Sequence, residues 1–233
     1  MQTNHRTSVV GLFLALAPLA FTATAQDRQA RDLAGFESVS IGGGLDLFLR
    51  QGERFVVEVE SSEPSEIVTE IRGGTLDVRR ERSFFDFFDW GDHGAVHVTM
   101  PALVALTASG GSDVRTEGSF SGNALRLDAS GGSDVAIDVA VGELELQASG
   151  GSDVSLTGSA RTAHVQSSGG SDVDASRFTT DEANVESSGG SDLSIAVRER
   201  IVGHASGGSD ITYSGEPRSA DVDTSGGGDV THR

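Results

Sequence analysis

The sequence predicts an all-β protein, a right-handed parallel β-helix with coils of about 19 residues and a less regular N-terminal part. A six-residue motif, Ser-Gly-Gly-Ser-Asp-Val or a one-residue variant of it, occurs seven times, and successive copies start 18 to 21 residues apart. Alternating apolar and polar segments separate the copies, and no stretch between them keeps a helical period. The motifs begin at Ser109, Ser130, Ser149, Ser168, Ser188, Ser206 and Ser225.

The paired glycines of each motif are predicted to form sharp corners between short strands. A corner needs positive φ, or backbone that packs directly on the coil below, and glycine accepts both at little cost. The predicted corner residues are Gly110, Gly111, Gly131, Gly132, Gly150, Gly151, Gly169, Gly170, Gly189, Gly190, Gly207, Gly208, Gly226 and Gly227.

The aliphatic residue that ends each motif is predicted to point inward and to stack on its equivalents in neighbouring coils. The residue before each motif is small, which predicts a thin and tightly packed cross-section. The aliphatic column comprises Val114, Val135, Val154, Val173, Leu193, Ile211 and Val230. The small residues are Ala108, Ala129, Ala148, Ser167, Ser187, Ala205 and Thr224.

The N-terminal part, residues 36–104, contains looser versions of the same unit. Gly43–Gly44 and Gly73–Gly74 each precede an Asp-aliphatic pair, and alternating strands are expected over residues 55–60 and 95–100. This part is either a set of irregular coils or a small antiparallel sheet that caps one end. We expect it to form one domain with the regular repeats of residues 105–233, after a short segment at 26–35.

The stretch 36–47, followed by Gln51–Gly52 and by residues 101–103 before the first motif, resembles the head-GIN domain family, a bacterial domain of unknown function labelled an auto-transporter adhesin. The resemblance covers about residues 33–233. It implies a secreted or periplasmic β-helix, and it brings no catalytic residues. No translocator barrel follows the last motif, so we expect export through a signal peptide alone.

Residues 1–25 have the features of such a signal peptide. An apolar run over 9–21 follows Arg6, and Ala23-Thr24-Ala25 provides a small-x-small cleavage site. The apolar run is shorter than the ~20 residues of a membrane span. We therefore expect an exported protein, periplasmic or at the cell surface, without a transmembrane segment.

The composition excludes several kinds of chemistry. The chain has 35 acidic and 17 basic residues, for a net charge of −18, and every basic residue is arginine. Without cysteine or lysine, there can be no disulfide, thiolate metal site, thiol nucleophile or lysine general base. The negative charge disfavours nucleic acid as a partner.

The aspartates of the motifs are predicted to form a ladder along the solenoid. Neighbouring carboxylates about 4.8 Å apart repel by ~0.9 kcal/mol in water and ~3.5 kcal/mol at an effective dielectric constant near 20. Calcium could offset this repulsion. Alternatively, corner amides and the adjacent motif serines cap each carboxylate, and then no metal or other cofactor is needed. The ladder comprises Asp113, Asp134, Asp153, Asp172, Asp192, Asp210 and Asp229.

One segment departs sharply from the rest in composition, since residues 84–90 hold four phenylalanines and the only tryptophan. Exposed aromatic side chains mark contact surfaces, whereas a buried cluster would seal the open end of the solenoid. The candidate contact residues are Phe84, Phe85, Phe87, Phe88 and Trp90.

We expect a non-enzymatic binding module, an adhesin of the bacterial envelope that contacts a protein or glycan of the envelope or of a host surface. A passive scaffold and a calcium-stabilised solenoid are the alternatives. Polysaccharide-active β-helices use loops to build a cleft, and coils of 18 to 21 residues leave no room for such loops. After the last motif an unpaired strand edge is expected, through which copies of the chain could associate.

Overall fold

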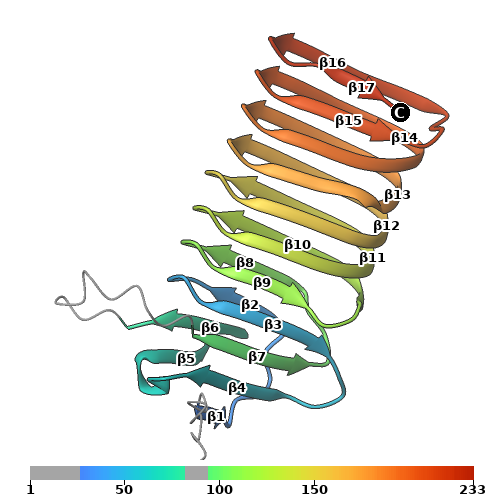
Figure 1. Ribbon diagram of the computed structural model, residues 1–233. Helices are drawn as coiled ribbons and strands as arrows, with labels where there is room; N and C mark the ends of the chain where they lie inside the picture. The colour runs from blue at the N-terminus through green and yellow to red at the C-terminus, as the bar shows by residue number, and fades with distance from the viewer. Residues whose placement is uncertain (1–26, 82–93) are drawn as a thin grey trace, which may run out of the picture.

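The computed structural model describes residues 27–81 and 94–233, which form a solenoid of stacked β-coils with an antiparallel cap at its N-terminal end (Figure 1). Seventeen strands belong to one continuous hydrogen-bonded sheet. In this part of the chain the single helix is a short 3-10 turn, η1 (Pro64–Glu66), so no described helix is long and apolar enough to cross a membrane. The predicted all-β solenoid is confirmed. The predicted signal peptide lies outside the described residues.

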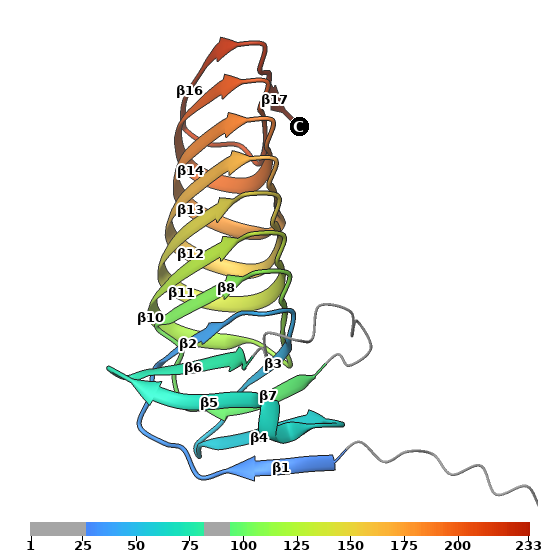
Figure 2. The same ribbon diagram turned by 90° about the vertical axis from the view of Figure 1, so that its left-hand side faces the viewer.

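The regular coils stack in parallel with an offset equal to the sequence repeat. Between β11 and β12, pairing runs from Asp134 opposite Asp153 to Ser149 opposite Ser168, a shift of 19 residues at both ends. Each of the long strands bends midway and so forms both walls of its coil (Figure 2). The strands are β8 (Ala105–Ser109), β9 (Asp113–Thr116), β10 (Phe120–Ser130), β11 (Asp134–Ser149), β12 (Asp153–Gly169), β13 (Asp172–Gly189), β14 (Asp192–Gly207), β15 (Asp210–Ser214), β16 (Ser219–Gly226) and β17 (Val230–His232).

The glycine pairs lie at the corners, where successive coils approach closely. In the early coils both glycines have positive φ, as at Gly131 (68°) and Gly132 (75°), whereas from Gly169 onward only the first of each pair does. The later corners stack through backbone hydrogen bonds, with the Gly190 N–H donating to the Gly169 carbonyl at 2.8 Å. A side chain at these first positions would meet the corner of the coil below.

The aliphatic column predicted from the motifs is present inside the solenoid. Val135, Val154 and Val173 are register partners, and each is 2% exposed. The small residue before the motif is also buried in six coils, but the prediction is wrong for Thr224. Thr224 is exposed because it belongs to β16, which no further coil of the described chain covers.

Six of the seven motifs have a second serine, which is buried, and in five of them it links one coil to the preceding one. The Ser152 hydroxyl accepts a hydrogen bond from the Ser149 N–H and donates one to the Ala129 carbonyl of the preceding coil, both at 3.2 Å. Because buried polar groups need partners, these hydroxyls favour one register. Hydroxyls that bond in the same way to the preceding coil are those of Ser133, Ser171, Ser191 and Ser209.

The N-terminal coils are stacked in an order that differs from the sequence. Strand β2 (Ser38–Ile41) pairs with both β6 (Thr75–Arg80) and β8, while β3 (Asp46–Gln51) pairs with both β7 (Ala95–Met100) and β9. The β2–β3 coil therefore lies between the β6–β7 coil and the regular stack. These four strands are parallel to their coil neighbours, as the irregular-coil interpretation predicts.

Antiparallel strands cover the outer side of this end, so both interpretations of the N-terminal part hold for different strands. Strand β4 (Val56–Ser61) pairs with β7 on one side and with β1 (Asp27–Arg31) on the other, and β5 (Ile67–Arg72) pairs with β6. Although Gly73–Gly74 resembles the motif glycines in sequence, it does not form a coil corner. These glycines form the tight turn of the β5–β6 hairpin, where φ is +58° and +82°.

The corner geometry predicts a large difference between two neighbouring glycine substitutions. In Gly189→Ala, the new Cβ would lie 2.7 Å from the Gly169 carbonyl oxygen at a φ of +86°, so the free energy of unfolding should fall by at least about 1–2 kcal/mol. Gly170→Ala is the matched control, because nothing lies within 4 Å of its Cβ and its φ is not positive. Its effect should stay below about 1 kcal/mol. Urea denaturation followed by circular dichroism measures both, and equal losses would contradict the stacked-corner interpretation.

Candidate functional site

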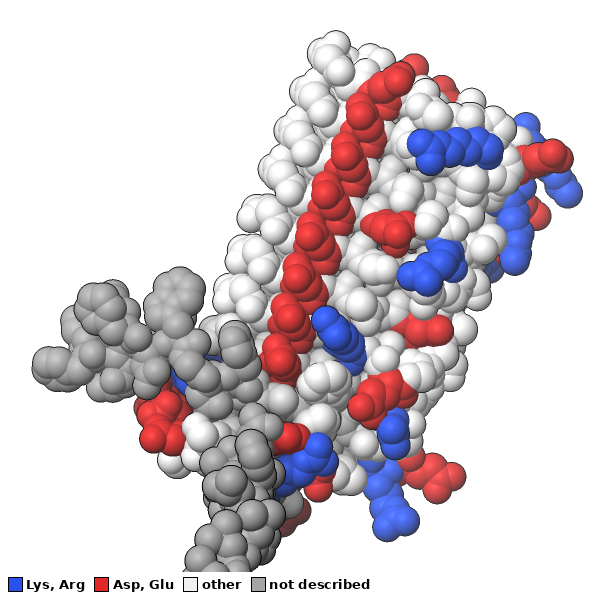
Figure 3. Space-filling model, in the orientation of Figure 1, with Lys and Arg blue, Asp and Glu red and all other residues white. Residues whose placement is uncertain are grey.

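The motif aspartates form a continuous acidic row along one side of the solenoid. Register pairing joins them from coil to coil, and the row is visible as the red stripe in Figure 3. The row also includes Asp46, which pairs with Asp113 although it belongs to the looser N-terminal copy. Its members are Asp46, Asp113, Asp134, Asp153, Asp172, Asp192, Asp210 and Asp229.

Most of these carboxylates are exposed to solvent and have no serine cap. Six of the eight aspartates are exposed, and Asp46 and Asp113 are half-buried. The predicted capping by the adjacent motif serines is wrong, because those serines point inward and donate to backbone carbonyls instead. At the C-terminal end, the Asp229 N–H donates to Asp210 Oδ1 at 2.9 Å. Within residues 27–81 and 94–233, no three histidine or acidic side chains are placed to hold a metal ion.

Polar side chains on the outer faces pair across neighbouring coils. Arg126 Nη1 contacts Glu145 Oε1 at 2.6 Å, and the Gln166 amide donates to Glu186 at 3.2 Å. Such contacts join residues that are opposite each other in the parallel register. They add side-chain links between neighbouring coils to the backbone ladder.

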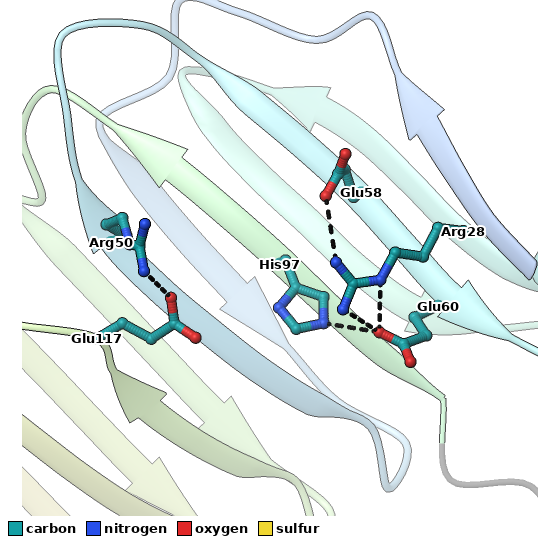
Figure 4. A network of polar contacts seen from close by, with 6 residues as sticks. All are labelled: Arg28, Arg50, Glu58, Glu60, His97 and Glu117. Carbon is teal, nitrogen blue, oxygen red and sulfur yellow. Dashed lines mark hydrogen bonds and ion pairs between the residues drawn. The ribbon is translucent and has the colours of Figure 1, made fainter. Parts of the chain in front are cut away.

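The cap carries a second network, centred on Glu60 of β4 (Figure 4). Arg28 of β1 contacts Glu60 at 2.7 Å, and His97 Nε2 lies 3.1 Å from the same carboxylate oxygen. Partial burial tends to raise the pKa of Glu60, but the Arg28 and His97 hydrogen bonds and charges outweigh it and lower that pKa. The His97 ring also stacks on Phe48 at a centroid distance of 4.9 Å. The network therefore ties β1, β3, β4 and β7 together.

The aromatic contact segment falls outside the described residues. Phe84, Phe85, Phe87, Phe88 and Trp90 belong to residues 82–93, between the end of β6 and the start of β7. The chain resumes at Gly94, whose carbonyl accepts a hydrogen bond from the Asp46 N–H at 3.0 Å. Gly94 thus lies beside Asp46 at the N-terminal end of the acidic row.

Comparison with known proteins identifies the family. A family model described as "putative auto-transporter adhesin, head GIN domain" matches residues 35–217. The chain belongs to this family. The predicted resemblance is confirmed. No curated protein matches the chain in sequence.

Solved structures share the fold of this head GIN domain. A putative adhesin from Bacteroides fragilis superposes with a TM-score of 0.83 at 20% identity, covering 91% of this chain and 98% of that one. A putative lipid binding protein from Parabacteroides distasonis gives a TM-score of 0.68 at 16% identity, with 91% and 98% covered. A putative adhesin from Parabacteroides merdae gives 0.64 at 16% identity, with 91% and 97% covered. At these identities the likeness concerns the fold alone.

The acidic row of the head GIN domain predicts that removing one charge stabilises the protein. Asp153 has a carboxylate neighbour in the coil on each side, so Asp153→Asn should raise the free energy of unfolding by about 1 kcal/mol at low ionic strength, and by less in salt. Asp46→Asn is the control, since Asp46 has Asp113 on one side and Ala95 on the other. It should give about half the effect in urea denaturation.

Calcium bridging would reverse this result. If calcium held the row together, Asp153→Asn would destabilise the protein, and a chelator would lower the melting temperature of the unmodified chain. The two interpretations therefore give effects of opposite sign in the same measurement.

The Glu60 network predicts an acid-sensitive cap. Because the folded-state pKa of Glu60 is lowered from 4.5, its ion pairs stabilise the fold above that value, and this contribution is lost as the pH falls through the folded-state pKa. Glu60→Gln should therefore cost up to about 1 kcal/mol of unfolding free energy at pH 7 and almost nothing near pH 2. Glu53→Gln, at an exposed site, should have no effect at either pH. A loss at Glu60 that persists in acid would show that the side chain acts through packing.

Proposed function

We propose that this chain is an exported, non-enzymatic adhesin of the bacterial envelope, which binds its partner through exposed surfaces of the solenoid. The observation that carries the proposal is the uninterrupted stack itself. It presents long polar faces with regularly spaced side chains. A depression of about 390 Å³ beside β1 and β5 is wide open to solvent. Such faces suit contact with a large partner better than enclosure of a small substrate.

The distribution of the acidic residues supports a binding role over an enzymatic one. Carboxylate-based glycosidases hold two acids on opposite sides of one scissile bond. Here the motif aspartates are spread evenly along the axis, one in each coil. The family description as an adhesin points in the same direction.

Export and cell-surface or periplasmic location are part of the proposal. They rest on the signal-peptide features of residues 1–25 and on the adhesin description of the family. The net charge of −18 disfavours nucleic acid and anionic bilayers as partners, which leaves proteins and glycans.

Self-association through the C-terminal edge stays a prediction. Within the described chain, β16 pairs with β14 and β17 pairs with β15, so the outer edge of both strands is free of a partner strand. Val222 and Val230 at this end are half-buried against the core. A second copy or another chain that adds a strand here would bury them.

A binding screen tests the proposed function directly. The exported chain should bind at least one surface among bacterial cells, envelope polysaccharides and host matrix, and binding to none of them would leave a passive scaffold as the better interpretation. Replacing the five aromatic residues of the predicted contact segment with serine should abolish binding with no change in melting temperature. A large fall in melting temperature would instead indicate that they seal the solenoid. The variant residues are Phe84, Phe85, Phe87, Phe88 and Trp90.

A further inference from the structure

A second shallow depression, of about 220 Å³, crosses three neighbouring coils on an outer face of the solenoid. Its rim consists of two columns of register partners contributed by β12, β13 and β14. Thr162, Glu182 and Arg200 form the first column. His164, Asn184 and Val202 form the second.

The floor of the depression is made by small residues between these columns. Ala163 and Ala183 face inward there and also line the depression. They occupy the column that holds Leu144 in the preceding coil and Ile201 in the following one. Two alanines in succession thus replace bulky side chains beneath the hollow.

The polar side chains around this hollow are left without partners. Glu182 and Arg200 are opposite each other in register and carry opposite charges, yet no ion pair joins them. Among the described residues, the side chains of His164 and Asn184 likewise make no hydrogen bond with the protein. This contrasts with the Arg126–Glu145 and Gln166–Glu186 pairs. Unpaired donors and acceptors therefore line one concave spot.

The chemistry of the rim suits sugar hydroxyl groups. Arg200 donates, Glu182 accepts, and the amide of Asn184, the imidazole of His164 and the hydroxyl of Thr162 can each do both. A sugar hydroxyl also donates and accepts, so it can use all of these groups at once. The adjacent guanidinium and carboxylate balance in charge, and the negative charge of the whole chain disfavours an acidic ligand.

We propose that this depression binds one unit of an uncharged saccharide, an inference that rests on the proposed adhesin function and names its ligand class. The volume of about 220 Å³ is smaller than the ~300–1,000 Å³ of clefts that enclose drug-sized ligands, so a single sugar unit is accommodated. The open, solvent-exposed rim implies weak binding at one site. Several copies on one surface would raise the avidity.

The test is an NMR titration of the ¹⁵N-labelled exported chain with defined oligosaccharides. The neutral probes are maltohexaose, cellohexaose and mannohexaose, and a hexamer of galacturonic acid is the acidic probe. At least one neutral probe should shift the amide resonances of β12–β14 around the two columns. The double variant Glu182→Gln/Asn184→Ala should weaken that binding by about tenfold or more.

Glu143→Gln is the matched control. Glu143 is exposed and lies in the same column, opposite Thr162 but outside the lining of the depression. The control should leave the affinity for the neutral probe unchanged, and circular dichroism melting should show that all variants remain folded.

The inference is overturned if no neutral probe shifts these resonances, if the double variant binds as well as the unmodified chain, or if the acidic probe binds more tightly at the same residues. Its failure is distinguishable from failure of the proposed function. Binding to cells or matrix in the screen, without shifts at β12–β14, removes the sugar site and leaves the adhesin. Absence of binding in both experiments removes both.

Discussion

The whole structure depends on the close approach of backbone to backbone at one corner of every coil. Glycine at that corner lets the coil above donate a hydrogen bond to the coil below, as from Gly208 to the Gly189 carbonyl at 2.7 Å. The buried motif serine beside it fixes the register through a carbonyl of the preceding coil. Once identical corners are stacked, the residue that follows the corner lies directly over its equivalent in the preceding coil. The acidic row is therefore a consequence of the register, and it does not by itself require a ligand.

The stacking of the corners also determines at which positions the side chains can vary. Motif positions are restricted by the corner, whereas many outward positions in the strand before the motif vary from coil to coil. One column reads Arg126, Glu145, His164, Asn184 and Val202 from coil to coil. Recognition that depends on particular side chains can arise at such variable positions without disturbing the stack. The depression over β12–β14 is located there.

Much of the fold follows from the sequence because a fixed repeat spacing dictates the register. Side chains alternate in direction within the motif, so Asp points outward between an inward serine and an inward aliphatic residue. Applied strictly, this alternation predicts that the serine hydroxyls form their hydrogen bonds inside the solenoid. The coil order at the N-terminal end could not be predicted in this way, because β2 and β6 are distant in sequence and carry only a weak motif. Gly73–Gly74 shows the same ambiguity, since one dipeptide serves equally as a coil corner and as a hairpin turn. The depression can be recognised only when the register of three coils is known. Aligning the repeats and looking for opposite charges at equivalent positions of adjacent coils could have found it.

A rigid stack changes what weak polar contacts can achieve. A flexible loop that binds a sugar loses conformational entropy on binding, but the side chains of β12–β14 are already spaced by the sheet at about 4.8 Å intervals. The interior of those coils is closed by residues such as Phe178, which is fully buried, so the outer face has little freedom to adjust. With a net charge of −18, the solenoid repels acidic polymers at long range but exerts no such force on uncharged ones. Selection for neutral saccharides can then come from exclusion of charged competitors as much as from direct contacts at the rim.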